Sequence, residues 1–133
     1  MKITASIKNS ALQNEVIVNT EGSEKQLSIP GKTVGRGSSV NGGELIFLAL
    51  ATCFCNDIYR ESARRNINIH SVEVTVSGEF GNEGEPASSI KYKTDIHSDA
   101  SEEEILALII HVDKIAEIHN TLRLGVDVSL DLS

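Results

Sequence analysis

The chain has 133 residues, a formal net charge of −7 and ordinary apolar and charged fractions, which argues against disorder. This length fits one domain, residues 1–133, with a core that needs no disulfide or metal staple. The negative charge excludes nucleic acid as a bulk partner, because phosphate binding needs clustered Lys and Arg. The longest apolar run, residues 45–51, is too short to span a bilayer, and the N-terminus lacks a signal-type apolar stretch. We therefore expect a cytoplasmic protein that does not enter a membrane.

The first third of the chain predicts three short β-strands, because apolar and polar residues alternate there. These strands are residues 2–8, 15–20 and 25–30. The polar segment 9–14 and Gly22 predict the turns between them, and Pro30 ends the third strand. Short strands with tight connections predict an antiparallel meander. The glycine-rich stretch 31–43 matches neither a P-loop nor a dinucleotide fingerprint, so we interpret it as a loop.

A helix is predicted from Gly43 to about Arg65. Glu44 lies in its first turn, where a carboxylate suits the positive end of the helix dipole. The segment 45–55 is apolar on every face, which predicts that the N-terminal half of the helix is buried and that its amphipathic C-terminal half emerges. The basic residues near the C-terminus suit the negative end of the dipole; they are Arg60, Arg64 and Arg65.

The second half of the chain predicts a hairpin, a helix and a last strand. The alternating segments 71–80 and 90–97 flank a turn, so they form the hairpin. Asp99 or Ser101 caps the next helix, which closes near Ile118. Residues 126–132 alternate again and predict the final strand. The resulting order, β-β-β-α-β-β-α-β, indicates an α+β fold with antiparallel sheets.

Two cysteines lie on the first helix, and their spacing does not fit a secreted disulfide framework. Cys53 has Asp57 one turn later, and both this carboxylate and apolar surroundings oppose thiolate formation. Without a nearby cation, Cys53 is expected to be an inert core thiol. Cys55 lies about 200° further around the helix, so it is a poor disulfide partner and is expected to pack in the core.

Residues 41–54, Asn-Gly-Gly-Glu-Leu-Ile-Phe-Leu-Ala-Leu-Ala-Thr-Cys-Phe, resemble the central-helix signature of the OsmC/Ohr family. That signature is a Glu near the helix start, an apolar stretch, then a small residue and Cys. The resemblance implies antiparallel sheets around a central helix, an intertwined homodimer with active sites between subunits, and no cofactor. It also implies a thiol-dependent peroxidase for organic hydroperoxides, in which Cys53 is the peroxidatic residue and Glu44 the helix carboxylate.

Two positions depart from the family pattern. His119 stands about where the family has its resolving Cys, just after the last helix. The resemblance therefore implies an external reductant, either a monothiol or a dithiol. The family also uses an Arg from the N-terminal strands, whereas the first Arg here is Arg36. The residues that could replace this cation, among which the sequence does not choose, are Lys8, Lys25, Lys32 and Arg36.

Helix geometry separates Glu44 from Cys53. Nine residues correspond to about 13 Å along the axis and about 180° around it, so one site that uses both needs a second subunit. His111 and His119 lack a third ligand, so we expect no metal site. Two other functions stay open: a non-catalytic dimer that binds a small apolar ligand in the subunit cleft, and a purely structural or interaction dimer.

Overall fold

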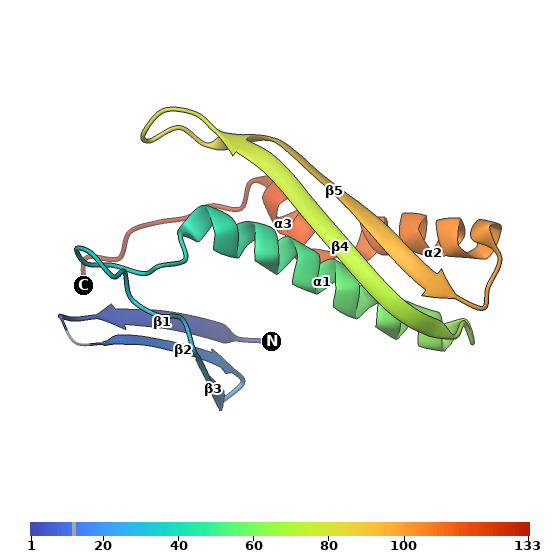
Figure 1. Ribbon diagram of the computed structural model, residues 1–133, viewed down its shortest axis with the longest axis horizontal. Coiled ribbons are helices and arrows are strands. Elements are labelled where there is room, and N and C mark those ends of the chain that lie inside the picture. Colours follow the sequence, from blue (N-terminus) through green and yellow to red (C-terminus); the bar gives the residue numbers. More distant parts are fainter. Residues whose placement is uncertain (12) are drawn as a thin grey trace. The chain divides into compact units, whose positions relative to one another are not determined.

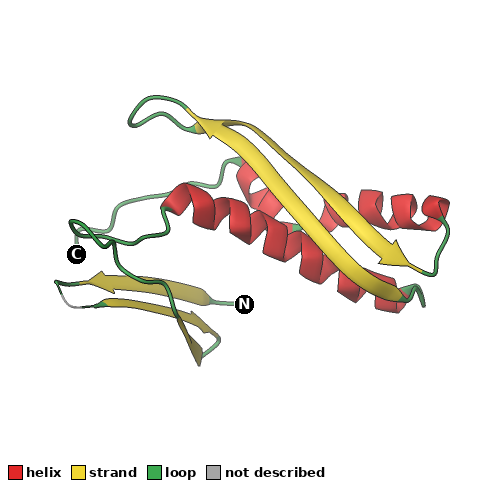
Figure 2. Cartoon of the chain, viewed as in Figure 1, coloured by secondary structure: helices red, strands yellow, loops and turns green. Residues whose placement is uncertain are grey.

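The computed structural model describes residues 1–11 and 13–133, and the chain divides into two compact units, Met1–Leu45 and Ile46–Ser133. Each unit is described by itself. The described elements form an α+β protein with two antiparallel sheets and three helices, which confirms the predicted fold class (Figures 1 and 2). None of the helices in the described residues is long and apolar enough to cross a membrane.

The first unit contains a three-stranded antiparallel meander, as predicted. Its strands are β1 (Ile3–Asn9), β2 (Asn14–Thr20) and β3 (Ser23–Leu27), and β2 lies in the middle. Glu21 and Gly22 both have positive φ, as tight hairpin turns require, and glycine adopts that conformation without steric cost. The predicted turn 9–14 includes residue 12, which lies outside the described residues. The loop predicted at 31–43 spans residues 28–41 instead, because β3 ends earlier than expected, and it carries one isolated bridge between Gly31 and Ser38.

Helix α1 (Gly42–Arg64) matches the predicted helix within one residue at each end. Asn41 caps it: the Glu44 N–H donates to Asn41 Oδ1 (2.8 Å), and the Asn41 N–H donates to Glu44 Oε1 (3.1 Å). This reciprocal pair satisfies backbone donors that the first turn leaves unpaired. Glu44 therefore lies where the sequence predicts, in the first turn.

The prediction that the N-terminal half of α1 is buried and its C-terminal half exposed is wrong for the single chain. In the N-terminal half, Ile46 is 37% exposed and Leu48 60% exposed. The C-terminal half, by contrast, buries polar and charged residues as well as apolar ones. Its buried residues are Phe54, Asp57, Ile58, Glu61 and Ser62. The physical reason is local: these polar groups have hydrogen-bond or ionic partners, while the described residues of the chain do not cover the exposed apolar side chains.

The second unit packs helices against a long hairpin. Strands β4 (Ile69–Phe80) and β5 (Ala87–Ser98) pair antiparallel, and Figure 2 shows them as the two longest arrows, crossing the helices on one face. The core joins Phe54 and Ile58 of α1 to Leu108 and Val112 of the next helix. Alternate strand residues close this core; they are Val72, Val74, Tyr92 and Ile96. The predicted hairpin is therefore confirmed.

Gly78 permits a close approach between β4 and α1. A Cβ atom at this position would lie 2.7 Å from Cζ of Phe47, closer than real Cβ contacts. The ring of Phe47 also packs against Phe80, with ring centroids 5.9 Å apart. The register of the hairpin shifts between Ser77 and Glu79, so the glycine coincides with an irregularity of the strand.

Two helices, rather than one, follow the hairpin. Ser101 caps α2 (Glu102–Ile115) with a capping box to Glu104, which selects Ser101 from the two predicted caps. The helix was expected to close near Ile118, but Ala116 adopts an extended conformation (φ −65°, ψ 107°) and starts α3 (Glu117–Leu124). Gly125, in the left-handed region, ends α3.

The predicted strand 126–132 is wrong for the single chain. These residues form neither helix nor strand, and Val128 is 92% exposed. Alternation indicates that one face of a segment is apolar, but a strand also needs a neighbouring edge that supplies backbone hydrogen bonds. No such edge pairs with this segment in the described part of the chain.

Candidate functional site

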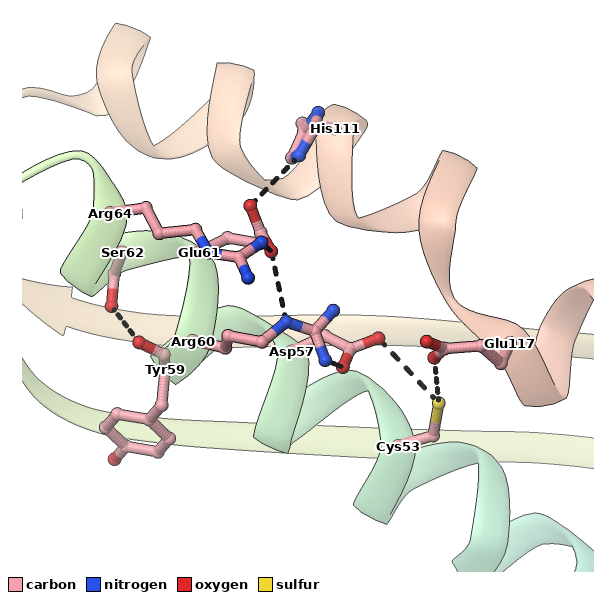
Figure 3. Close-up of polar contacts among 9 residues, drawn as sticks. All are labelled: Cys53, Asp57, Tyr59, Arg60, Glu61, Ser62, Arg64, His111 and Glu117. Atoms are coloured by element: carbon pink, nitrogen blue, oxygen red, sulfur yellow. Dashed lines mark hydrogen bonds and ion pairs between the residues drawn. The ribbon is translucent and has the colours of Figure 1, made fainter. Parts of the chain in front are cut away.

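Cys53 is half-buried on α1 and lies beside two carboxylates (Figure 3). Its Sγ is 3.8 Å from Oδ2 of Asp57 and 3.9 Å from Oε2 of Glu117. Asp57 is one turn further along α1, as the i,i+4 spacing predicts. Glu117 comes from the first turn of α3, and sequence reasoning missed it. The site is therefore built from two helices of the second unit.

The surroundings of Cys53 raise the pKa of its thiol. Burial is the largest cause, and the negative charges of Asp57 and Glu117 add to it. The backbone N–H groups of Ile118 and Glu117, at the start of α3, act in the opposite direction. The net effect keeps the thiol protonated at neutral pH, which agrees with the sequence argument from Asp57.

The cation beside Asp57 is Arg60, which pairs with two carboxylates. Its Nη1 lies 2.8 Å from Oδ1 of Asp57, and its Nε donates to Oε1 of Glu61 at 3.1 Å. Burial raises the pKa of Asp57 more than Arg60 lowers it, so this carboxylate is more basic than usual. Asp57 thus contacts the thiol through one oxygen and the guanidinium through the other (Figure 3).

Glu61 extends the same network away from Cys53. Its carboxylate, only 7% exposed, also accepts from Arg64 (2.7 Å) and lies 3.2 Å from Nε2 of His111. Arg64 is in the last turn of α1, as predicted. Ion pairs with a buried carboxylate add to the dipole interaction that the sequence suggested for Arg60 and Arg64. The i,i+3 spacing from Asp57 to Arg60 and from Glu61 to Arg64 is the signal that would have predicted them.

The other predicted site residues lie apart from Cys53. Glu44 hydrogen-bonds with Asn41 at the start of α1. It precedes Cys53 by nine residues on the same helix, which corresponds to about 13 Å along the helix axis. Cys55 is half-buried, and both cysteines are free thiols. His111 binds Glu61, and His119 is 4% exposed and packs against Phe54 and Tyr92 with centroid distances of 5.6 and 4.6 Å.

Within the described residues, three groups near Cys53 could hold a metal ion together. The thiol of Cys53 and the carboxylates of Asp57 and Glu117 have ligand atoms within 4.8 Å of one another. One sulfur and two oxygens form a ligand set that zinc accepts. Arg60 competes for Asp57, however, because a guanidinium and a divalent cation seek the same carboxylate.

The fold and this site define a small α+β protein with a half-buried thiol on its longest helix. The family model for OsmC-like protein matches residues 35–131, so the chain belongs to the OsmC-like family. No curated protein sequence matches it.

Solved structures agree with this fold. The OsmC-like protein from Mycoplasma pneumoniae superposes with a TM-score of 0.63 at 22% identity, over 90% of this chain and 87% of that one. The organic hydroperoxide resistance protein OsmC from Legionella pneumophila gives 0.54 at 23%, over 98% and 95%. The organic hydroperoxide resistance protein OhrB of Bacillus subtilis gives 0.52 at 19%, over 99% and 96%.

Proposed function

We propose that this protein is a thiol-dependent peroxidase that reduces organic hydroperoxides through Cys53. Two solved structures with the same fold are named organic hydroperoxide resistance proteins, and the chain belongs to their family. The observation that carries the proposal is the position of the Cys53 sulfur, half-buried beside both a carboxylate of raised pKa and the N–H groups that begin α3. A peroxidatic thiol needs a base that accepts its proton and donors that stabilise its charge.

Asp57 supplies the base in this mechanism. The thiol proton passes to Asp57, so the pair keeps one negative charge and the backbone N–H groups of Glu117 and Ile118 face the thiolate. The thiolate attacks the terminal peroxide oxygen, the O–O bond breaks, and Cys53 becomes a sulfenic acid. The leaving alkoxide takes the proton back from Asp57 and departs as an alcohol.

An external thiol restores Cys53. A first thiol condenses with the sulfenic acid to give a mixed disulfide and water, and a second thiol reduces that disulfide. Cys55 follows Cys53 by two residues on α1, where side chains do not face each other, so it is unsuited to resolve the intermediate. His119 stands where the family pattern has its resolving cysteine, which leaves the external thiol as reductant.

We infer a homodimer as the working form. Glu44 and a basic residue of the N-terminal unit would reach the Cys53 site from a second subunit, and Lys8, Lys25, Lys32 and Arg36 are the candidates. The apolar half of α1, exposed in one chain, supports burial against another copy. Residues 1–133 would then act as one domain. Sizing in solution tests the dimer, and a stable monomer would contradict the shared site.

The peroxidase proposal is tested by mass spectrometry of Cys53 after reduced protein meets cumene hydroperoxide. We expect sulfenic acid to form far faster than on free cysteine, to be lost in Cys53→Ser and to persist in Cys55→Ser. If Asp57 is the base, Asp57→Asn slows the reaction about 100-fold. Asp95→Asn, a matched change at an exposed carboxylate on β5, leaves the rate unchanged. A faster reaction in Asp57→Asn would show that Asp57 only opposes the thiolate.

The raised pKa of Cys53 supports a second candidate function. A thiol that stays protonated fits a non-catalytic dimer that binds a small apolar ligand in the subunit cleft. Oxidation of Cys53 no faster than that of free cysteine would favour this function and exclude the peroxidase.

A further inference from the structure

A cavity of about 220 Å³ opens in the second unit, beside α1, β5 and α3. Its walls are mostly apolar, and Cys53 is not among the residues that line it. The lining residues are Leu50, Ile90, Tyr92, His119, Leu122 and Arg123. They come from three elements far apart in the sequence, so the cavity is a product of the fold.

His119 is the unusual group in this wall. Its side chain is 4% exposed, and neither Nδ1 nor Nε2 has a hydrogen-bond partner among the described residues. Most buried polar side-chain atoms are paired, and leaving one unpaired lowers the stability of the folded protein. A ligand that offers a hydrogen-bonding group in the cavity would remove this cost.

The charges around the cavity favour an uncharged ligand. Burial, followed by the positive charge of Arg123, lowers the pKa of His119, so the imidazole is neutral and offers one donor and one acceptor. The Arg123 guanidinium is paired with Asp113 at 2.6 Å, which cancels most of its attraction for an anion. The Tyr92 hydroxyl donates to the same carboxylate, and burial raises its pKa to about 12, so it stays neutral.

The volume sets the size of the ligand. An engineered apolar cavity of about 150 Å³ in another protein holds benzene. A cavity of about 220 Å³ therefore accepts one six-membered ring with a small substituent. A hydroxyl substituent matches a neutral imidazole, because each group is both donor and acceptor.

We propose that this cavity binds a small, uncharged, ring-sized molecule whose single hydroxyl group hydrogen-bonds to the imidazole of His119. Both ring nitrogens are closed off from solvent, so the imidazole turns about its Cβ–Cγ bond to meet the hydroxyl, a torsion that is broad for histidine. This site goes beyond the proposed peroxidase function and does not depend on the chemistry of Cys53.

Benzyl alcohol and toluene, which differ by one hydroxyl, test the proposal by NMR titration of the Cys53→Ser protein, where no thiol chemistry interferes at that position. We expect benzyl alcohol to shift the His119 ring resonances and to bind about 10-fold more tightly than toluene, which corresponds to one hydrogen bond. His119→Phe keeps the aromatic packing and should reduce the affinity for benzyl alcohol to that for toluene. His97→Phe, at an exposed histidine on β5, should change neither affinity.

Leu122→Trp provides a second variant, because a larger side chain at this 40% exposed position fills the cavity and should abolish binding of both compounds. Equal affinities for the two compounds, tighter binding of benzoate, or no binding because a second copy of the chain fills the cavity would each overturn the proposal. Peroxidase activity is measured in a separate experiment, by following the oxidation of Cys53, so either proposal can fail without the other.

Discussion

The N-terminal half of α1 is apolar and largely exposed, whereas its C-terminal half is rich in charge and largely buried. Leu48 in the first half is 60% exposed, while the Asp57 and Glu61 side chains in the second are 4% and 7% exposed. Arg60, Arg64 and His111 supply partners for the buried carboxylates. A charged residue can thus be buried where its ionic partners are buried with it or lie beside it, while apolar residues stay exposed where the described part of the chain does not cover them.

The largest expected effect is a difference in unfolding free energy between substitutions in the two halves of α1. Phe54→Ala removes a fully buried ring from the core and should lower the free energy of unfolding by about 3–5 kcal/mol. Leu48→Ala, in the exposed half, should cost less than about 1 kcal/mol in dilute protein. Urea unfolding measures both values.

Repeating the measurement at high protein concentration sharpens this comparison. If a second copy covers the apolar half, the cost of Leu48→Ala grows with concentration, while that of Phe54→Ala does not fall. A dilute-protein cost of Leu48→Ala that matches Phe54→Ala would contradict the difference in burial.

A smaller effect is expected where the N-terminal half of α1 is packed. Gly78→Ala forces the Phe47 ring aside and should destabilise the protein by about 1–3 kcal/mol. Combining it with Phe47→Leu should recover a large part of that loss, because the pair is in direct contact. Gly42→Ala is the matched control, since no atom lies within 4 Å of the added Cβ. If the losses of stability from Gly78→Ala and Phe47→Leu simply add in the double variant, the added methyl group does not clash with the Phe47 ring.

The smallest effect concerns pH. The hydrogen bond from Arg60 is the largest cause that lowers the pKa of Glu61, so its stabilising contribution is present above the ordinary value of 4.5 and is lost as pH falls below it. Glu61→Gln should flatten the dependence of unfolding free energy on pH between about 5 and 3. His111→Gln, which removes one partner, should give an intermediate slope. An unchanged slope in Glu61→Gln would mean that the carboxylate is not paired in solution.

Local patterns predicted most elements of this fold. Period-two alternation predicted β1, β2, β4 and β5, and the capping-box spacing predicted Ser101 as one of two caps of α2. These signals succeed because they involve neighbours in the chain. The strand expected at 126–132 failed because alternation shows that a segment has two faces but does not supply the edge with which it pairs.

Half of the surroundings of Cys53 could be predicted. The i,i+4 spacing places Asp57 beside the thiol, whereas Glu117 is 64 residues away. Glu117 reaches Cys53 because the helix is interrupted at Ala116, between α2 and α3. Alanine is the best helix former, so nothing in the sequence marks that interruption. The unpartnered nitrogens of His119 were equally hidden, because they depend on how three elements pack.

Helix α3 carries Glu117 to the thiol and, two residues later, His119 to the cavity. It is fastened to α2 at its other end by Arg123, which donates to both the backbone and the side chain of Asp113. One short helix therefore contributes residues to two chemically different sites, the thiol and the cavity. A substitution that displaces it, at Arg123 or Asp113 for example, will report on both at once, so a loss of peroxide reduction in such a variant says nothing about the thiol until ligand binding has been measured in the same protein.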